Sequence, residues 1–204
     1  MLKRDFLKSA IAGAFASAMP FASSAIAEGD GIVEMALGAD DGAKVTLIEY
    51  ASFTCGHCAN FHRDVFKQLK ADYIDTGKIR FVYREVYFDK YGLWASMLAR
   101  CEPSKFFGMA ELFYKSQSTW TRAGNDAAIV DEMKKIGRLA GLSDDQMDTC
   151  LQNEGELRAL VDWSRANAEE HGINSTPSFI LNGVKHSNMP YTDLQALLDE
   201  ALGA

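Results

Sequence analysis

The sequence predicts an α/β fold in which an all-helical segment is inserted into a small core of strands and helices. β-branched and aromatic runs at residues 45–51 and 79–83 flank a stretch with helical periodicity, which gives the order strand, helix, strand. Residues 91–172 show only helical periods. Residues 178–186 return to strand character around Asn182-Gly183, a dipeptide typical of hairpin turns. We therefore expect one domain with a helical insertion over about 91–172.

The first 27 residues have the three parts of a secretory signal peptide. Cationic residues precede an alanine-rich apolar stretch at 10–22, and small residues lead up to Ala27, after which we expect cleavage. The segment around Lys3-Arg4 resembles a twin-arginine motif with Lys in place of the first Arg, so the Sec route and a twin-arginine-like route are both open. A membrane anchor is the alternative, but Pro20 and several serines make this stretch a poor spanning helix.

Export would leave a mature domain of residues 28–204 in the periplasm, and this domain is acidic. The full chain has a net charge of −7, and losing three cations and one acid with the signal peptide changes it to −9. Because the mature chain has no cluster of Lys and Arg, we expect no nucleic-acid binding. The four cysteines then lie in a compartment where disulfides persist, which points to redox chemistry or structural bridges.

The first predicted strand runs directly into the sequence Cys55-Gly56-His57-Cys58. Apolar residues then recur at every fourth position, at Phe61, Val65 and Leu69. This spacing predicts one helix that begins at the cysteines and ends within 72–77. His62 lies beside the apolar stripe, and we interpret it as a packed histidine rather than a ligand.

The inserted segment contains a series of helical periods, at residues 94–101, 104–114, 126–140, 143–151 and 156–171. Ser143 and Gln146 have the spacing of a capping box, which supports a helix start at that position. After the hairpin, Pro190 can begin a last helix. The apolar face of that helix consists of Leu194, Leu197, Leu198 and Ala201.

Two cysteines separated by two residues at a helix N-terminus differ in their reactivity. We expect Cys55 to be exposed and Cys58 to be partly buried. The free amides and the positive end of the helix dipole favour a thiolate at Cys55, and a protonated or hydrogen-bonding His57 adds to this effect. A stabilised thiolate favours the dithiol over the disulfide, so the disulfide form is an oxidant.

A structural disulfide and half of a zinc site are the other interpretations of this motif. The zinc interpretation uses Cys55, Cys58 and His62, which fall within eight residues. A second pair of ligands at zinc spacing is missing, because Cys101 and Cys150 are isolated in predicted helices. We therefore expect no metal and no other cofactor.

The order of strand, Cys55-Gly56-His57-Cys58, helix, strand, helical insertion, Thr176-Pro177 and hairpin resembles the DsbA-like thiol:disulfide oxidoreductases of the thioredoxin fold. The resemblance covers nearly all of the mature chain. It implies that the bond before Pro177 is cis and that this residue lies against the active disulfide. Gly56 replaces the usual Pro of DsbA proteins, as in protein disulfide isomerases, and Thr176 stands where many DsbA proteins have Val. Both departures adjoin the sulfurs, where they bear on the oxidising strength and on the reoxidising partner.

Glu49 lies six residues before Cys55 and matches the acidic residue that DsbA-like proteins keep near the buried cysteine. The resemblance implies a carboxylate beneath the active site that accepts a proton from Cys58 during the exchange. The alternative is an exposed strand residue without a role in the chemistry.

Cys101 and Cys150 lie in two different predicted helices of the insertion. In an oxidising compartment we favour a second, structural disulfide between them, which would stabilise the fold by restricting the unfolded chain. Two buried thiols that behave as small apolar side chains are the alternative.

These features predict an exported oxidase that introduces disulfides into reduced, newly exported proteins by exchange with Cys55 and Cys58. The resemblance implies reoxidation by a membrane protein of the DsbB type, and we expect a monomer without a prosthetic group. Two alternatives stay open. One is a disulfide isomerase or reductase of the same fold, and the other is a carrier that binds a metal through Cys55, Cys58 and His62.

Overall fold

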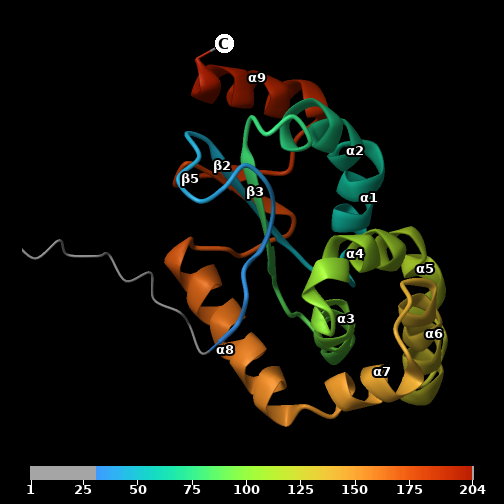
Figure 1. Cartoon of the computed structure of the whole chain (residues 1–204). Helices are drawn as coiled ribbons and strands as arrows, with labels where there is room; N and C mark the ends of the chain where they lie inside the picture. Colours follow the sequence, from blue (N-terminus) through green and yellow to red (C-terminus); the bar gives the residue numbers. More distant parts are fainter. Residues whose placement is uncertain (1–30, 204) are drawn as a thin grey trace, which may run out of the picture.

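A mixed five-stranded sheet lies at the centre of the protein, in the strand order β1-β3-β2-β4-β5 (Figure 1). The computed structural model describes residues 31–203, so the predicted signal peptide at 1–27 lies outside the described residues. The strands are β1 (Met35–Gly38), β2 (Thr46–Ala51), β3 (Arg80–Glu85), β4 (Ser178–Leu181) and β5 (Val184–Ser187). β2 and β3 are parallel, and the other neighbouring pairs are antiparallel.

Glycines are needed at two turns of this sheet. The predicted hairpin between β4 and β5 is present, with positive φ angles of 47° at Asn182 and 86° at Gly183. Gly38 ends β1 at a φ of 87°, and a Cβ atom there would lie 2.3 Å from the carbonyl oxygen of Ile79. A larger residue at this position would therefore push the edge strand away from the chain that leads into β3.

The connection from β2 to β3 is helical, but the prediction of one continuous helix is wrong. It consists of α1 (Gly56–Asp64), α2 (Phe66–Leu69) and a π-helical turn, η1 (Lys70–Ile74). In this turn the Asp75 N–H donates to the carbonyl oxygen of Lys70, a spacing of five residues. The wider turn lets Tyr73 and Ile74, which are adjacent in sequence, both pack in the core. The four-residue period of the preceding apolar stripe does not reveal such a change.

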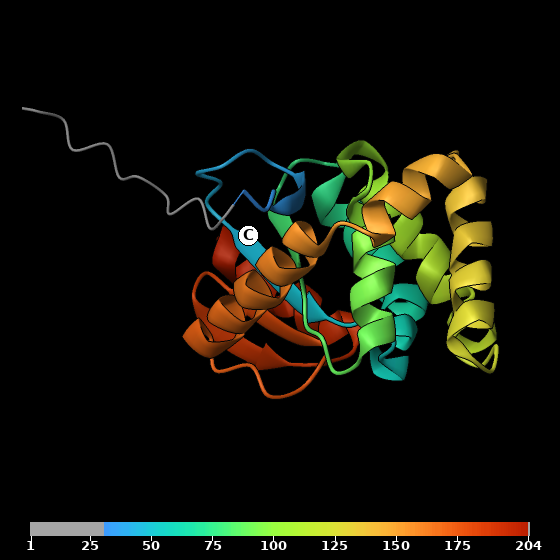
Figure 2. The ribbon, with the colours of Figure 1, turned by 90° about the horizontal axis from the view of Figure 1, so that it is seen from below.

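The helical insertion lies between β3 and β4, which confirms the predicted fold class. It comprises α3 (Lys90–Arg100), η2 (Pro103–Lys105), α4 (Phe106–Lys115), α5 (Gln117–Trp120), α6 (Asp126–Leu139), α7 (Asp144–Leu151) and α8 (Glu154–Glu170). Figure 2 shows α3 to α7 gathered beside the sheet, while α8 returns across it. The last helix is α9 (Tyr191–Leu202), with Pro190 as its N-cap. The capping box of Ser143 and Gln146 is also present, at the start of α7.

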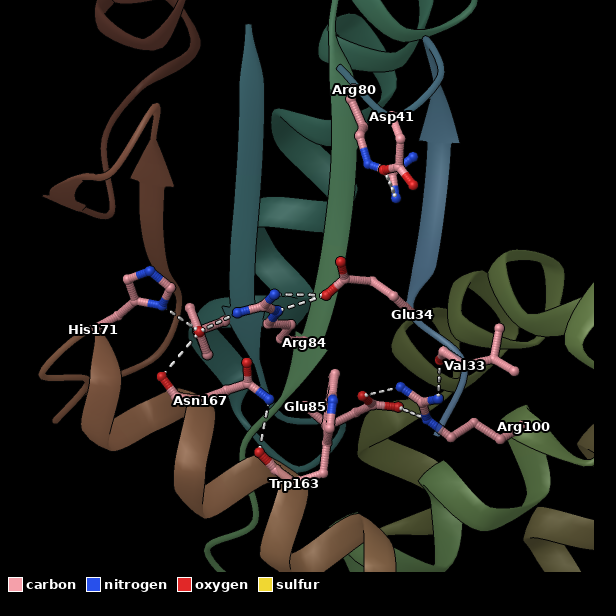
Figure 3. Close-up of polar contacts among 11 residues, drawn as sticks. Val33, Glu34, Asp41, Arg80, Arg84, Glu85, Arg100, Trp163, Asn167 and His171 are labelled. Carbon is pink, nitrogen blue, oxygen red and sulfur yellow. Dashed lines mark hydrogen bonds and ion pairs between the residues drawn. The ribbon is translucent and has the colours of Figure 1, made fainter. Parts of the chain in front are cut away.

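Side-chain alternation along the strands separates the two faces of the sheet. Tyr50 and Arg84 are register partners in β2 and β3, and they lie on the face that α8 covers (Figure 3). Glu49 and Tyr83, the preceding pair of partners, point to the opposite face, toward His62 of α1. One face therefore supports α8, and the other holds the side chains beneath the cysteines.

A polar network joins α8 to the sheet (Figure 3). The buried hydroxyl of Tyr50 lies 3.0 Å from the carbonyl oxygen of Asn167 and 2.7 Å from Nδ1 of His171. Arg84 donates to this hydroxyl at 3.0 Å and to the Glu34 carboxylate at 2.8 Å. Burial raises the pKa of Tyr50, so the hydroxyl keeps its proton for these bonds.

A buried ion pair holds the first helix of the insertion against the sheet (Figure 3). The Glu85 carboxylate accepts two hydrogen bonds from Arg100, at 2.6 and 2.7 Å, and both side chains are buried. Arg100 also donates to the carbonyl oxygen of Val33 at 2.7 Å, and the Ser164 hydroxyl donates to the Glu85 carbonyl at 2.8 Å. This pair therefore links β3, α3, α8 and the segment before β1.

A disulfide joins Cys101, the C-cap of α3, to Cys150 in α7. The two Cα atoms are 5.7 Å apart, and the bridge closes a loop of 49 residues. The geometry agrees with the disulfide that the sequence favoured over two buried thiols. Within residues 31–203, every helix is too short or too polar to cross a membrane.

Replacing both Cys101 and Cys150 with Ala should destabilise the fold without changing the other cysteine pair. Closure of a 49-residue loop restricts the unfolded chain, which corresponds to at most about 4 kcal/mol. We expect urea denaturation to show a free energy of unfolding lower by about 2–4 kcal/mol. The pH titration of the Cys55 thiolate should be unchanged. Equal free energies of unfolding for the variant and the parent would contradict a disulfide that restricts the unfolded chain.

Candidate active site

Cys55 follows β2 and is the N-cap of α1. Its sulfur accepts a hydrogen bond from the backbone N–H of Cys58 at 3.4 Å, and its own N–H donates to the Ser52 carbonyl at 3.0 Å. N-cap side chains satisfy the free amides at the start of a helix, and the helix dipole is positive there. Cys55 is partly exposed, Cys58 is fully buried, and both are free thiols. The structure therefore represents the dithiol state.

The pKa of the Cys55 thiol is lowered to about 5. The largest cause is a hydrogen bond from the Cys58 side chain to the thiolate. A hydrogen bond from the Thr176 side chain and the backbone N–H groups of Cys58 and His57 act in the same direction, while partial burial opposes them. Cys55 is therefore a thiolate at neutral pH, as a reactive cysteine requires.

His57 acts on Cys55 through its backbone. Its N–H is one of the donors that lower the pKa of Cys55, whereas its side chain is exposed. The amides at the N-terminus of α1 thus supply the stabilisation that the sequence predicts for them. The role expected of the His57 imidazole stays a prediction.

Cys58 has the opposite electrostatic environment. Burial raises the pKa of its thiol well above the ordinary value, and the hydrogen bond to Cys55 and the negative charge of Glu49 act in the same direction. Cys58 therefore keeps its proton while Cys55 is ionised. The site combines a charged, accessible sulfur with a neutral, enclosed one.

The loop that leads into β4 lies against the reactive sulfur. The Thr176–Pro177 peptide bond is cis, as the resemblance implied. The Cys55 thiol donates to the carbonyl oxygen of Thr176 at 3.4 Å, and the side chain of the same residue binds the thiolate form. Gly56, in contrast, is exposed. Apart from its two chain neighbours and the backbone of its own helix, no described atom lies within 4 Å of the position that a Cβ would occupy. Thr176 therefore affects the sulfur directly, while the space around Gly56 admits a side chain.

Glu49 is fully buried, so the alternative of an exposed strand residue is wrong. Its two carboxylate oxygens lie 3.0 and 3.2 Å from Nε2 of His62 in α1. The His62 ring stacks on Tyr114 of α4, with ring centroids 4.2 Å apart. His62 is therefore packed, as expected, and it also provides the polar partner that a buried carboxylate requires.

The carrier alternative requires Cys55, Cys58 and His62 to converge on one point, and in the described residues they do not. Within the described residues, no three His, Cys, Asp or Glu side chains are arranged to hold a metal ion. His62 is directed to Glu49, and the Cys55 sulfur accepts hydrogen bonds from the backbone N–H and the side chain of Cys58.

Two supports of the cysteine loop were missed in the sequence. The side-chain amide of Gln117 in α5 donates to the carbonyl oxygens of Phe53 and Cys55, at 2.7 and 3.0 Å. The Thr54 hydroxyl donates to Asp89 at 2.7 Å, and the same carboxylate caps the N-terminus of α3. An Asp before a helical period is a recognisable N-cap signal, but nothing in the sequence marks Gln117.

Known proteins resemble this chain in sequence and in fold. The family model described as thioredoxin matches residues 31–200. A Rickettsia bellii protein named as a protein-disulfide oxidoreductase is 33% identical over 171 residues, which are 83% of this chain and 64% of that protein. The chain thus spans less than two thirds of the length of this relative. Crystal structures of alpha-DsbA1 from Wolbachia pipientis and of BdbD from Bacillus subtilis have TM-scores of 0.75 and 0.71, at 29% and 20% identity. The match to alpha-DsbA1 covers 83% of this chain and 91% of the Wolbachia chain. The match to BdbD covers 84% of this chain and 94% of the Bacillus chain.

A thioredoxin fold with a helical insertion and a cysteine pair at its first helix defines a class of dithiol proteins. The chain belongs to the thioredoxin family. Its predicted likeness to DsbA proteins is confirmed by the Rickettsia and Wolbachia relatives.

Thr176→Val should weaken the thiolate at Cys55. Valine keeps the backbone carbonyl and the shape of the side chain but removes the hydroxyl that binds the charged sulfur. Because hydrogen bonds to charged groups contribute about 1.5 kcal/mol or more, the pKa of Cys55 should rise by about one pH unit. The absorbance of the thiolate, followed from pH 3 to 9, measures this change. The parent should lose its thiolate as the pH falls through about 5. Coincident titrations of parent and variant would rule out a role for the hydroxyl.

Proposed function

We propose that the protein is an exported, periplasmic oxidase that transfers a Cys55–Cys58 disulfide to reduced, unfolded proteins. The observation that carries this proposal is the opposite displacement of the two thiol pKa values, to about 5 for Cys55 and upward for Cys58. A stabilised thiolate favours the dithiol form, so the disulfide form tends to oxidise its clients. The name of the Rickettsia relative, a protein-disulfide oxidoreductase, agrees with this chemistry.

Oxidation of a client proceeds through two thiol exchanges. A client thiolate attacks the sulfur of Cys55, a mixed disulfide forms, and Cys58 is released and takes up a proton. A second client thiolate then attacks the client sulfur of the mixed disulfide. The client disulfide forms and Cys55 leaves as a thiolate, which its low pKa favours. Two electrons pass from the client to the protein, and the exchange itself needs no prosthetic group.

The reduced protein then needs an acceptor for these two electrons. We propose a membrane protein of the DsbB type, which the likeness to DsbA proteins supports. Thr176 and Gly56 adjoin the sulfurs, so they bear on which acceptor is used. The predicted signal peptide at 1–27 supports a reaction in the periplasm, where a monomer would meet clients as they emerge.

Glu49 is the proposed proton acceptor for Cys58. During reoxidation Cys58 must lose its proton, although burial raises its pKa. Glu49 is buried close enough for its charge to act on this thiol, and its other contact is the His62 imidazole. A carboxylate at this place can take the proton that water cannot reach.

Glu49→Gln tests this role, because glutamine keeps the size of the side chain and an oxygen for His62. The test reaction is closure of the disulfide by Cys58 after Cys55 has been joined to glutathione, measured at pH 7. Loss of a general base should slow closure by about tenfold or more. If the charge of Glu49 acts only by raising the pKa of Cys58, its removal should make closure faster instead. Glu200→Gln, an exposed acid in α9, is the matched control and should close at the parent rate.

Refolding of ribonuclease tests the oxidase assignment. The disulfide form should restore activity to reduced, unfolded ribonuclease. Recovery from scrambled ribonuclease alone would instead identify an isomerase. Cys55→Ser should abolish turnover, because no sulfur remains for the client to attack. Cys58→Ser should accumulate mixed disulfides between Cys55 and clients, visible on non-reducing gels, which a metal carrier does not predict.

A further inference from the structure

Two cavities are lined by residues of both α1 and α4. These two helices lie beside each other in Figure 1. One, of about 510 Å³, begins at Gly56 and His57, the residues that follow Cys55. The other, of about 580 Å³, extends to Lys67 and Lys70. They share the side chains of Ala59, Arg63, Tyr114 and Lys115. The two cavities therefore adjoin, and we call them together the α1–α4 groove. Its near end lies at Gly56 and His57, next in sequence to the reactive cysteine.

The far half of the α1–α4 groove has an apolar floor and a cationic rim. The floor includes Leu37, Phe66, Phe107 and Tyr114. The rim includes Arg63, Lys67, Lys70 and Lys115, and Glu111 lines the same cavity. The volume of this cavity, about 580 Å³, lies in the range of sites that enclose a small ligand or a few side chains. Such a lining suits a ligand with both an apolar group and negative charge.

The positive rim contrasts with the charge of the whole chain, which is −7. Arg63 and Lys70 are each paired with a nearby aspartate. Over residues 31–203, by contrast, Lys67 and Lys115 take part in no ion pair. Both are exposed. Their charges are thus available to a carboxylate that enters from solvent.

The position of the groove fits a polypeptide held at Cys55. The helical path from Gly56 to Lys67 is about 16 Å long. This length corresponds to about five residues of extended chain. A client in mixed disulfide with Cys55 has its flanking residues at the groove, because Gly56 and His57 form its near end. An extended segment can therefore follow the groove as far as the unpaired lysines.

We propose that the α1–α4 groove binds the extended segment that flanks the reactive cysteine of a client protein, and that it selects segments carrying an apolar side chain and acidic residues. The apolar side chain occupies the floor, and the carboxylates bind Lys67 and Lys115 at the rim. The inference rests on the proposed function and names a substrate class for it. Unfolded clients meet the requirement, because their cysteines and apolar side chains are exposed together.

Short dithiol peptides test this preference with the disulfide form of the full mature chain. Three peptides share their cysteines and carry, on both sides, leucine with glutamate, leucine with lysine, or serine with glutamate. Each second-order rate of peptide oxidation is divided by the rate of the same peptide with a small aromatic disulfide. The ratio removes the effect of flanking charge on the reactivity of the peptide thiol.

The leucine–glutamate peptide should react about tenfold faster than the leucine–lysine peptide, and the advantage should shrink at high salt. The serine–glutamate peptide should also be slower, because it leaves the floor empty. Lys67→Glu combined with Lys115→Glu should abolish or invert the preference for acid. Lys78→Glu combined with Lys135→Glu makes the same charge change at exposed lysines outside the groove and should preserve the preference.

The outcomes separate failure of the groove from failure of the proposed function. If the parent oxidises none of the peptides, the oxidase assignment fails. If it oxidises all three at equal normalised rates, the oxidase assignment stands and the groove proposal is wrong. A preference that survives reversal of Lys67 and Lys115, or that the control reversal changes equally, would also overturn the groove proposal.

Discussion

The site depends on one interaction, the hydrogen bonding between the first turn of α1 and the sulfur of Cys55. Because Cys55 is the N-cap, the backbone amides of His57 and Cys58 and the Cys58 thiol stabilise negative charge on its sulfur. The same turn carries Cys58 into the core, where burial keeps it protonated. A single helical turn thus produces both halves of the asymmetry that dithiol exchange uses.

Long-range contacts hold the turn from several sides. The cis-Pro177 loop brings Thr176 against the sulfur, and Gln117 fastens the carbonyl of Cys55 to the insertion. Beneath the turn, Glu49 and His62 form a hydrogen bond with each other in a region that is otherwise apolar and aromatic. The sheet separates this face from the one that α8 covers, so the polar network around Tyr50 supports the scaffold without entering the site.

The insertion does more than enlarge the thioredoxin core. Tyr114 in α4 stacks on His62, and it also forms part of the floor of the α1–α4 groove. Lys115, the next residue, faces the groove from the insertion while Lys67 faces it from the thioredoxin core. An acidic chain thereby carries a local positive rim on an apolar floor, next to a thiolate. Under the proposed function, this combination would link the chemistry of the cysteine to a choice among clients.

The order of the elements and the reactive motif were determined by the sequence alone, because both depend on neighbouring residues. The Asn182-Gly183 turn, the Ser143 capping box and the placement of Cys55 at a helix start are examples. Tertiary structure alone decided the π turn at η1, the pairing of Glu49 with His62, and the support that Gln117 gives from 62 positions away. Each of these is set by how elements distant in the chain fill the same space. Periodicity and turn residues show which face of a segment is apolar and where the segment ends. Which other helix or strand packs against that face is decided only when the whole core packs.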